Sequence, residues 1–513
     1  MYFFTMASKR APSKAGNKKK KVLLLFPKTE FDPLKPRMPS SLVYLGTELK
    51  NAGYEPIIVD TRVEADCSTK IKHHLFDCLM VGITTMTGMQ IIYALELAKL
   101  VRKLNPSVPI VWGGVHPSIM PDQVLESPYV DIIGRHEGDR TIVLLAKALS
   151  NGKGLEKISG ISFKRDGRII STPEAELLDV NTLLPPDWTL IEPKKYRIFD
   201  VQSARGCPHR CEFCYNIMFN KQRWRAKSAE KVANEIEQII KGYGVEEINF
   251  IDDNFFTHRK RAEEMLDLIL ERKLKFTWRT NCRANYFDNF DESFLRRAYA
   301  AGLREVQIGC ESGSQKILDY MKKDITVKQI LNAVTLCRNA GVQAQCSFMI
   351  GMPIETARDN RMTFDLIDKL REIDQHVLIN MIAIYTPYPG APLFETAKKH
   401  GFQPPQSLDG WGNFSYTQVN VPWIKGWKRR EYESIAYISR FLFFKEEMRK
   451  RFITKSLKLP FEILSLDAKL RWKLRFFKLP LEWMLVKYFV LVRKNRRKEG
   501  RTDKTEIADE GMT

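Results

Sequence analysis

The sequence predicts an α/β protein: a doubly wound, Rossmann-like domain, then a partial (β/α)6 barrel of TIM type, then a helical region. Short apolar runs alternate with helical segments over residues 22–150 and again over 199–400. This alternation is typical of parallel sheets covered by helices. After residue 400 the strand pattern stops, and a helical, basic and aromatic-rich sequence is expected over 401–513.

The first domain is expected over residues 22–150. Its strands are predicted at 22–27, 56–59, 79–83, 110–112 and 130–133, and its helices at 40–52, 91–104, 123–127 and 141–149. The first strand, VLLLFP, is a continuous apolar run, which is typical of a buried parallel strand. Because no G-x-G-x-x-G follows it, we expect a ligand other than a dinucleotide above this sheet.

A change of texture separates the two sheets. Residues 151–198 combine a glycine-rich, hairpin-like piece with the turn-rich LLPPDW and are predicted to be a linker. The barrel is expected over 199–400. Its strands are predicted at 199–204, 247–251, 276–280, 305–309, 343–350 and 377–385, with helices at 229–241, 260–272, 292–300 and 327–340. Barrels of this type carry their chemistry at the C-terminal ends of the strands.

Composition excludes several classes of protein. Hydrophobic residues make up 44% of the 513, too many for a disordered chain, and nine cysteines are too few for a disulfide scaffold. The first residues lack the apolar core of a signal peptide, and no run reaches the 18 or so apolar residues of a spanning helix. We therefore expect a cytoplasmic protein, at most peripheral to the inner face of a membrane.

The net charge of +21 is concentrated at the two ends of the chain. Residues 1–21 contain seven Lys or Arg and no acid, and residues 441–498 contain seventeen against five acids. Such polycations are typical contact surfaces for phosphates of lipid or nucleic acid. The alternative interpretation is a disordered, solvated tail over 1–21 and a charge-rich helical face near the C-terminus.

Three cysteines stand in the C-x3-C-x2-C spacing of GCPHRCEFC, on the loop after the first barrel strand: Cys207, Cys211 and Cys214. Thiolates suit zinc or an iron–sulfur cluster. A structural zinc site needs four ligands, and His209 inside the loop is an awkward fourth. A four-iron cluster on three thiolates keeps one iron open for a substrate, so we expect a cluster, with zinc as the alternative. The other cysteines are expected to be small buried apolar residues: Cys67, Cys78, Cys282, Cys310, Cys337 and Cys346.

At this motif the sequence resembles the radical S-adenosylmethionine (SAM) superfamily. The resemblance implies a [4Fe-4S] cluster on the three cysteines, with SAM on the open iron. Reductive cleavage of SAM then gives a 5′-deoxyadenosyl radical. The implied SAM-binding residues are Phe213 before the last cysteine, Asp252, Asp253 and Asn254 in IDDNFF, Glu311 and Ser312 in GCESGS, and Gly351 in FMIGMPIET. YTPYPGAPLF continues the match at the sixth strand. The alternative for Asp252 and Asp253 is to cap the helix near Arg259.

With this barrel, the first domain resembles the cobalamin-binding domain found in many radical SAM enzymes. The matching loops are GITTMTG at 82–88, WGGVHPS at 112–118 and RHEGDRT at 135–141. The implied cobalamin-binding residues are Thr84, Thr85, Thr87, Gly113, Gly114, Glu137 and Gly138.

Two departures from that family pattern stand out. The D-x-H-x-x-G signature is absent after the first strand, so no histidine from that motif would bind cobalt. His136 replaces the first glycine of the usual G-E-G-E. His116 and His136 are expected to face solvent or stabilise their loops.

The resemblance implies an oxygen-sensitive enzyme that methylates, or closes a ring on, an unactivated carbon, with a reductant such as a ferredoxin or flavodoxin. RNA modification is one alternative. The related methylthio-transferring enzymes carry a second cluster on N-terminal cysteines, but this domain has only Cys67 and Cys78 and no RNA-binding barrel follows. Nucleic acid is therefore not an expected partner. A cluster-bearing, non-catalytic binding module is the other alternative.

The C-terminal region predicts contact with an anionic membrane and a lipid or other long apolar substrate. Two segments begin alike, at 458–462 and 478–482, with a proline placed to start a helix. Large apolar residues are interleaved with Lys and Arg there: Trp472, Phe476, Phe477, Trp483, Met484, Tyr488 and Phe489. Aromatic rings beside cations suit a helix lying in a bilayer interface. The alternative is a helical cap that packs its aromatic residues on the barrel.

Overall fold

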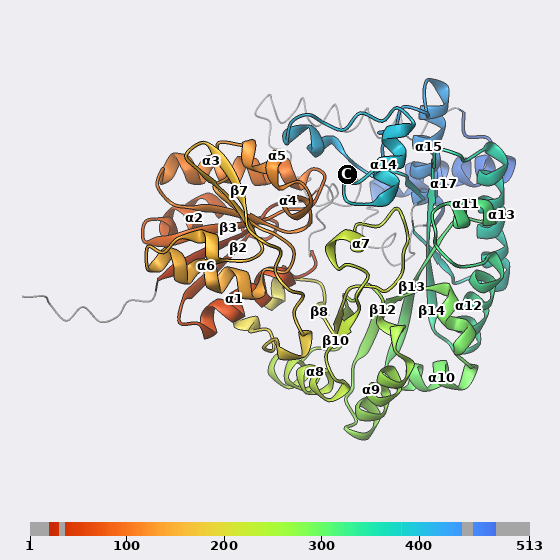
Figure 1. Ribbon diagram of the computed structural model, residues 1–513. Helices are drawn as coiled ribbons and strands as arrows, with labels where there is room; N and C mark the ends of the chain where they lie inside the picture. Colours follow the sequence, from red (N-terminus) through yellow and green to blue (C-terminus); the bar gives the residue numbers. More distant parts are fainter. Residues whose placement is uncertain (1–19, 30–35, 381, 444–454, 479–513) are drawn as a thin grey trace, which may run out of the picture.

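The computed structural model describes residues 20–29, 36–380, 382–443 and 455–478. Figure 1 shows the first domain, coloured red to yellow, beside a barrel coloured green to teal. The short helix α7 (Asn216–Phe219) lies between them and contacts α4 (Val115–Ile119) of the first domain. The expected α/β class with two sheets is confirmed.

The first sheet has the strand order β2-β1-β3-β4-β5-β6-β7. Its strands are β1 (Lys21–Phe26), β2 (Glu55–Asp60), β3 (Cys78–Thr84), β4 (Ile110–Gly113), β5 (Ile132–Gly134), β6 (Ile161–Arg165) and β7 (Arg168–Ser171). The first five strands are parallel. In β1, Val22 and Leu24 pack in one hydrophobic cluster and Leu23 and Leu25 in another, so the continuous apolar run is buried on both faces.

Helices cover both sides of this sheet. They are α1 (Ser40–Asn51), α2 (Cys67–Leu75), α3 (Gln90–Leu104), α4, α5 (Pro121–Glu126) and α6 (Asp139–Ser150). On one side of the sheet α1 packs with α6, and on the other side α2 packs with α3. The sequence reading did not include α2, whose composition is polar. It begins at Asp66, whose carboxylate accepts from the backbone N–H of Thr69 at 3.0 Å.

The segment 151–198, expected to be a linker, contributes two strands to the first sheet. Both β6 and β7 are antiparallel, with Ile161–Phe163 opposite β5. Ile161 and Phe163 are buried in the same cluster as the helices α1 and α6. The sheet therefore extends past the expected domain boundary at residue 150, because this hairpin carries apolar residues that complete the domain's core.

The second sheet is parallel, in the order β15-β14-β13-β12-β11-β8, with β16 also paired to β14. Its strands are β8 (Phe199–Val201), β11 (Glu247–Phe250), β12 (Thr277–Cys282), β13 (Leu303–Glu311), β14 (Gln343–Ile350), β15 (Leu378–Ile379) and β16 (Ala383–Ile384). The helices include α8 (Ala229–Tyr243), α9 (Arg259–Glu271), α10 (Glu292–Ala300), α12 (Val327–Asn339) and α13 (Ala357–Ile373). The partial (β/α)6 barrel is thus confirmed.

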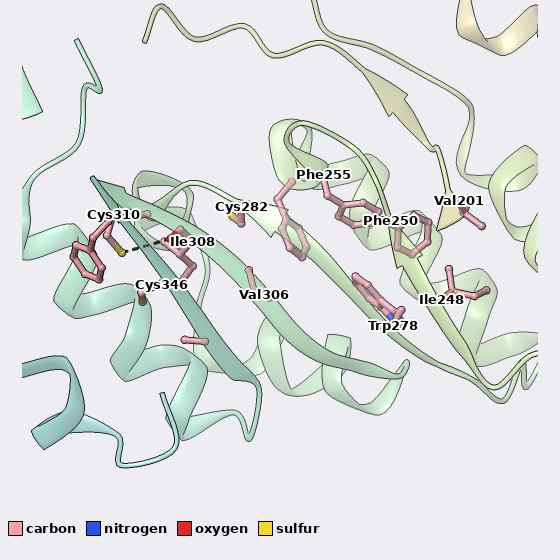
Figure 2. Packing of buried hydrophobic residues seen from close by; sticks show 14 of the residues in the cluster. Val201, Ile248, Phe250, Phe255, Trp278, Cys282, Val306, Ile308, Cys310 and Cys346 are labelled. Atoms are coloured by element: carbon pink, nitrogen blue, oxygen red, sulfur yellow. Dashed lines mark hydrogen bonds between the residues drawn. The ribbon is translucent and has the colours of Figure 1, made fainter. Parts of the chain in front are cut away.

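The two faces of the barrel sheet differ sharply. One face is an apolar core, in which Figure 2 shows Phe250, Phe255 and Trp278 packed together and Ile308 beside Cys310. Cys282, Cys310 and Cys346 lie in this core as free thiols. The alternating residues of β12, β13 and β14 are polar and partly exposed, and pair across the sheet: Asn281 with Gln307 and Gln307 with Gln345.

The C-terminal part of the chain begins on the first domain. After α14 (Pro392–Lys399), Phe402, Trp411 and Phe414 are buried in the same cluster as α3. The Gln123 side chain accepts from the Trp411 indole at 2.6 Å and donates to the Pro405 carbonyl at 2.9 Å. The helices α15 (Trp427–Phe443) and α17 (Lys455–Leu474) then pack against each other. Among the described residues, no helix is long and apolar enough to cross a membrane.

Candidate functional site

A closed loop carries the three cysteines. It leaves the short strand β9 (Ala204–Arg205) and returns through β10 (Arg225–Ala226), and the two strands pair antiparallel. Only glycine fits at position 206, where φ is +83° and a Cβ would lie 2.0 Å from the Arg223 carbonyl oxygen. The pairing of β9 with β10, which we call the ribbon, therefore fixes both ends of residues 206–224, which we call the cysteine loop.

The three thiols lie in one neighbourhood and influence one another. Burial raises the pKa of Cys214 to about 12, with Cys211 and Cys207 adding to the rise. The Arg283 guanidinium, at the end of β12, donates to the Cys211 sulfur at 2.9 Å. No three His, Cys, Asp or Glu side chains among the described residues surround one point as ligands of a single metal ion. The Cys211 sulfur therefore has a cationic donor beside it.

His209 is tied to the barrel instead of facing its neighbouring cysteines. Its Nε2 shares a hydrogen bond of 2.9 Å with the Tyr286 hydroxyl. Burial, together with the charges of Arg283 and Lys323, lowers the pKa of His209 to about 4. The neutral imidazole therefore holds the cysteine loop against the helical turn Ala284–Asn289 that follows β12.

The carboxylates at the end of β11 have different surroundings. Asp252 is fully buried and accepts from the backbone N–H groups of Ser203 at 2.7 Å and Ala204 at 3.0 Å, and also from the Ser203 hydroxyl. Burial raises its pKa to about 6 despite these bonds. Asp253 accepts from the Gly206 N–H at 3.0 Å and lines an interdomain cavity. Neither caps α9, which begins with the His258 side chain as its cap.

Asn254 follows these carboxylates and is buried. Both its amide oxygen and its amide nitrogen lack a hydrogen-bond partner within the protein. Buried polar atoms without partners are rare and costly. The Asn254 amide therefore has hydrogen-bonding capacity left for a ligand.

The residues at the ends of β13 and β14 form a second group. Glu311, at φ +61°, accepts from the buried Lys323 ammonium at 2.7 Å, and this ammonium lies 5.5 Å from the centre of the Phe213 ring. Glu311 and Phe213 are thus brought together. Ser312 is turned away toward α13, with its hydroxyl 3.2 Å from that of Thr363.

Gly351 ends β14 at a φ of +99°. Its N–H donates to Glu355, which also accepts from Met352 at 3.0 Å. Burial raises the pKa of Glu355 to about 7 despite these backbone donors. The carboxyl of Glu355 thus holds the turn after β14.

A cavity of about 390 Å³ lies between the first domain and the cysteine loop. From the first domain it is lined by Thr84, Gly113, Gly114, Glu137 and Gly138, among the residues expected there. From the barrel it is lined by Gly206 and Asp253. Thr85 and Thr87 do not line it: Thr85 is buried and bonds to the Gly113 carbonyl at 3.4 Å, and Thr87 bonds to His116 at 2.9 Å.

Several lining residues were missed by the sequence reading. They are Tyr44 and Leu45 of α1, Gly134 of β5, Gln202, Arg205, and Tyr215, Phe219 and Asn220 directly after the last cysteine. Position 134 is open, since a Cβ there would meet no atom within 4 Å. The sequence offers one signal for these residues: Tyr215 and Phe219 follow Cys214 closely and therefore lie on the same loop as the cysteines.

The two histidines noted in the sequence stabilise their loops. His116 is fully buried, burial lowers its pKa to about 4, and its Nδ1 bonds to Thr87. His136 adopts a φ of +60°, the left-handed conformation that glycine takes most readily, which explains why a glycine is usual there. Its Nδ1 lies 3.2 Å from the Phe219 carbonyl oxygen, across the domain boundary.

Known proteins resemble both parts of the chain. The family model of the Radical SAM superfamily matches residues 201–367, and that of the B12 binding domain matches residues 38–146. An uncharacterized methyltransferase of Pyrococcus horikoshii is 33% identical over 393 residues, which is 74% of this chain and 83% of the relative. The anaerobic magnesium-protoporphyrin IX monomethyl ester cyclase of Rubrivivax gelatinosus is 30% identical over 373 residues, which is 70% of this chain and 66% of the relative.

Solved structures share the fold. The cobalamin-dependent SAM radical enzyme OxsB, with aqua-cobalamin and SAM bound, aligns with a TM-score of 0.73 at 18% identity, covering 96% of this chain and 83% of that chain. The radical SAM methyltransferase TsrM from Kitasatospora setae aligns with a TM-score of 0.64 at 20% identity, covering 75% and 77%. At these identities the likeness concerns the fold.

Proposed function

The chain belongs to the radical SAM superfamily and carries a B12 binding domain in front of the barrel, and on this premise we propose that it is an enzyme that methylates, or closes a ring on, an unactivated carbon. The observation that carries this proposal is the cavity shared by the loops of the B12 binding domain and the cysteine loop. Two cofactors on these facing walls would meet in one space.

The residues present fit the three groups that this chemistry needs. The Arg283–Cys211 contact fits a thiolate-bound cluster, the unpartnered Asn254 amide fits a polar ligand, and the open space at Gly134 fits a bulky one. When bound, the [4Fe-4S] cluster and SAM supply a 5′-deoxyadenosyl radical, and cobalamin supplies a methyl group. A reductant such as a ferredoxin or flavodoxin would supply the electron.

The expected site residues divide into those that would touch a cofactor and those that would hold a loop. Cys207, Cys211 and Cys214 would bind the cluster. Phe213, Asp253, Asn254, Glu311 and Gly351 would bind SAM, and Thr84, Gly113, Gly114 and Gly138 would line the cobalamin. Asp252, Ser312, Thr85, Thr87 and Glu137 would act through the loops, since their polar atoms are engaged within the protein.

The test is anaerobic reconstitution with iron, sulfide and cobalamin, followed by chromatography of the 5′-deoxyadenosine formed from SAM. Replacing any one of Cys207, Cys211 or Cys214 by Ala should abolish the brown colour and the 5′-deoxyadenosine. Cys67→Ala is the matched control, because Cys67 is a free cysteine of the first domain. Stoichiometric zinc with undiminished activity in the triple variant would refute the proposal.

We also propose that the enzyme works at an anionic membrane surface on a lipid-like or other long apolar substrate. On α17, Ile463, Leu466, Leu470 and Leu474 expose 60%, 70%, 55% and 64% of their surface. Their spacing puts them on one face of the helix. The opposite face, with Ala468 and Trp472, is buried.

Charge favours a membrane as the occupant of this face. The exposed Lys469 and Lys473 lie beside the apolar stripe on α17 and the exposed Lys478 follows the helix, and each cation near an anionic bilayer contributes about 1 kcal/mol. An apolar stripe bordered by Lys is typical of a helix lying in the interface. The second repeat of the pattern, at 479–498, lies outside the described residues.

Liposome flotation tests the membrane proposal. The full chain should float with anionic vesicles at low salt and much less at high salt or with neutral vesicles. Leu466→Gln with Leu470→Gln should weaken flotation, while Leu144→Gln, at an exposed leucine of α6, is the control. A full chain that ignores anionic vesicles at low salt refutes the proposal. So does a double variant that floats as well as the unmodified chain.

A further inference from the structure

We propose that Arg205 and Arg225 are positioning residues that clamp the 137–139 loop of the first domain to the base of the cysteine loop, and so set the distance between the two cofactor sites. The inference rests on the proposed function for its consequence. The contacts themselves do not depend on any cofactor.

The two arginines stand side by side on the ribbon that bounds the cysteine loop. Arg205 of β9 and Arg225 of β10 are direct partners in the antiparallel pairing. Arg205 immediately precedes Gly206, and the first cysteine follows at 207. A displacement of this ribbon would therefore move the cysteine loop.

Each arginine binds a carboxylate of the first domain. Arg205 makes a two-pronged contact with Asp139, with Nη1–Oδ2 at 2.7 Å and Nη2–Oδ1 at 3.0 Å. Arg225 Nη1 donates to both oxygens of Glu137, at 3.0 and 2.8 Å, and to the Leu178 carbonyl at 2.7 Å. Arg205 Nη1 also lies 3.4 Å from Glu137, so the four charges form one connected network.

The network is shielded from water, which makes it sensitive to geometry. Burial alone would raise the pKa of Asp139, but the Arg205 guanidinium outweighs it and holds that pKa below its usual value. Buried charges with fixed, two-pronged geometry tolerate displacement poorly, because a misaligned ion keeps its desolvation cost without its partner. The clamp therefore favours one relative position of the two walls.

A second buried pair supports the same boundary nearby. Lys227, two residues after Arg225, donates to Glu235 at 2.6 Å and lies 3.4 Å from the Tyr44 hydroxyl of α1. Glu137, Asp139, Arg205 and Tyr44 all line the shared cavity. The residues that join the domains are thus the walls of the space in which the chemistry is proposed.

The test compares Arg205→Lys with the unmodified chain. Lysine keeps the charge but loses the two-pronged contact. Arg223→Gln is the matched control, because Arg223 is an exposed arginine of the same loop. The first measurement is hydrogen–deuterium exchange of residues 136–141 and 203–206 on the full chain without cofactors. We expect exchange about tenfold faster or more in Arg205→Lys, and unchanged in the control.

The second measurement is the magnetic interaction between the reduced cluster and cob(II)alamin in the reconstituted protein, read from its electron paramagnetic resonance spectrum. This interaction weakens steeply with distance, and a merely stabilising residue would not change it in correctly folded protein. We expect a weaker or more heterogeneous interaction in Arg205→Lys at unchanged iron and cobalamin content. An unaltered spectrum together with unaltered exchange overturns the clamp.

Two further outcomes are distinguishable. If Arg205→Lys does not fold, Asp139→Asn removes the same contact from the other side and must give the same faster exchange at 203–206, or the clamp is refuted. If the unmodified protein binds no cobalamin, the proposed function fails. In that case the exchange experiment alone still decides whether the arginines join the domains.

Discussion

At the scale of single residues, Asp252 and Asp253 are adjacent in sequence but do different work. Asp252 is enclosed and holds the backbone at Ser203 and Ala204, whereas Asp253 lines the shared cavity. A sequence can show that a strand ends in two carboxylates. It cannot show which one faces the ligand, because that depends on how the preceding strand enters its loop.

Substitution separates the two roles. Asp252→Ala leaves two buried backbone N–H groups without their acceptor and should destabilise the protein by about 2–4 kcal/mol. Asp253→Asn retains an oxygen for the Gly206 N–H and should cost less than about 1 kcal/mol while lowering the yield of 5′-deoxyadenosine. Urea unfolding and product chromatography on both variants check this. Equal losses of stability would contradict the assignment.

Glu355 should make stability depend on pH. Burial raises its pKa from 4.5 to about 7, so between these values the folded protein binds a proton that the unfolded chain has released. The free energy of unfolding therefore falls as the pH rises through this window, by roughly 3 kcal/mol from this residue. Glu355→Gln, which resembles the protonated carboxyl, should remove this pH dependence. The difference in the free energy of unfolding between pH 5 and pH 7.5, measured by urea unfolding, should therefore be smaller in the variant. An equal change in the free energy of unfolding with pH in both proteins would contradict the raised pKa of Glu355.

At the scale of strands and loops, three glycines of the cavity have different surroundings. A Cβ at Gly114 would lie 2.6 Å from the Thr85 carbonyl oxygen, at a φ of +99°. A Cβ at Gly113 would meet only the Gly134 oxygen, at 3.8 Å, and a Cβ at Gly134 would meet nothing within 4 Å. A bulky residue at 114 should therefore damage the fold, whereas one at 113 or 134 would fill open space in the cavity.

We expect Gly134→Leu to lower cobalamin occupancy severalfold in an optical titration, with little change in melting temperature. Gly114→Leu should lower the melting temperature itself, because backbone atoms cannot give way as a flexible side chain can. Gly242→Leu controls for the added side chain, since a Cβ there also meets nothing within 4 Å, its φ is not positive, and Gly242 lies outside the cavity. Full occupancy in Gly134→Leu would remove this position from the binding site.

The elements that the sequence predicts well are those with a local signal. The strand β1 and the helices α1 and α3 follow from apolar runs and helical spacing within one segment. For the hairpin β6–β7 the sequence predicts a linker, because its partner β5 lies about 30 residues earlier and its glycine-rich sequence resembles a turn. The same limit applies to the site, since the three cysteines are local whereas Arg283 reaches Cys211 from 72 residues away.

At the scale of the whole molecule, the segment after α14 joins the barrel to the first domain. Trp411 is fully buried between them, with its ring 5.6 Å from His116 and 4.9 Å from Phe414. The sequence placed this segment in a helical C-terminal region. It could not show that the aromatic residues return to a sheet that begins almost 400 residues earlier.

Trp411→Ala should therefore destabilise the first domain, at a cost of about 3–5 kcal/mol for a large buried side chain. Trp427→Ala, at a position that is 69% exposed, should change stability by less than about 0.5 kcal/mol. Hydrogen exchange resolved by peptide should show that Trp411→Ala accelerates exchange more in α3 than in α12 of the barrel. Loosening confined to the barrel would contradict this account of the segment.

The pairing of Glu137 and Asp139 with Arg225 and Arg205 has a consequence for inheritance. A substitution that removes one carboxylate leaves a buried guanidinium without its ion-pair partner. Each such loss therefore favours a compensating substitution in the other domain. Among relatives these four positions should covary. A chimera that joins the first domain of one relative to the barrel of another should fold only when the carboxylates of the first domain and the arginines of the barrel are both present. We therefore expect the two domains of this chain to be inherited together.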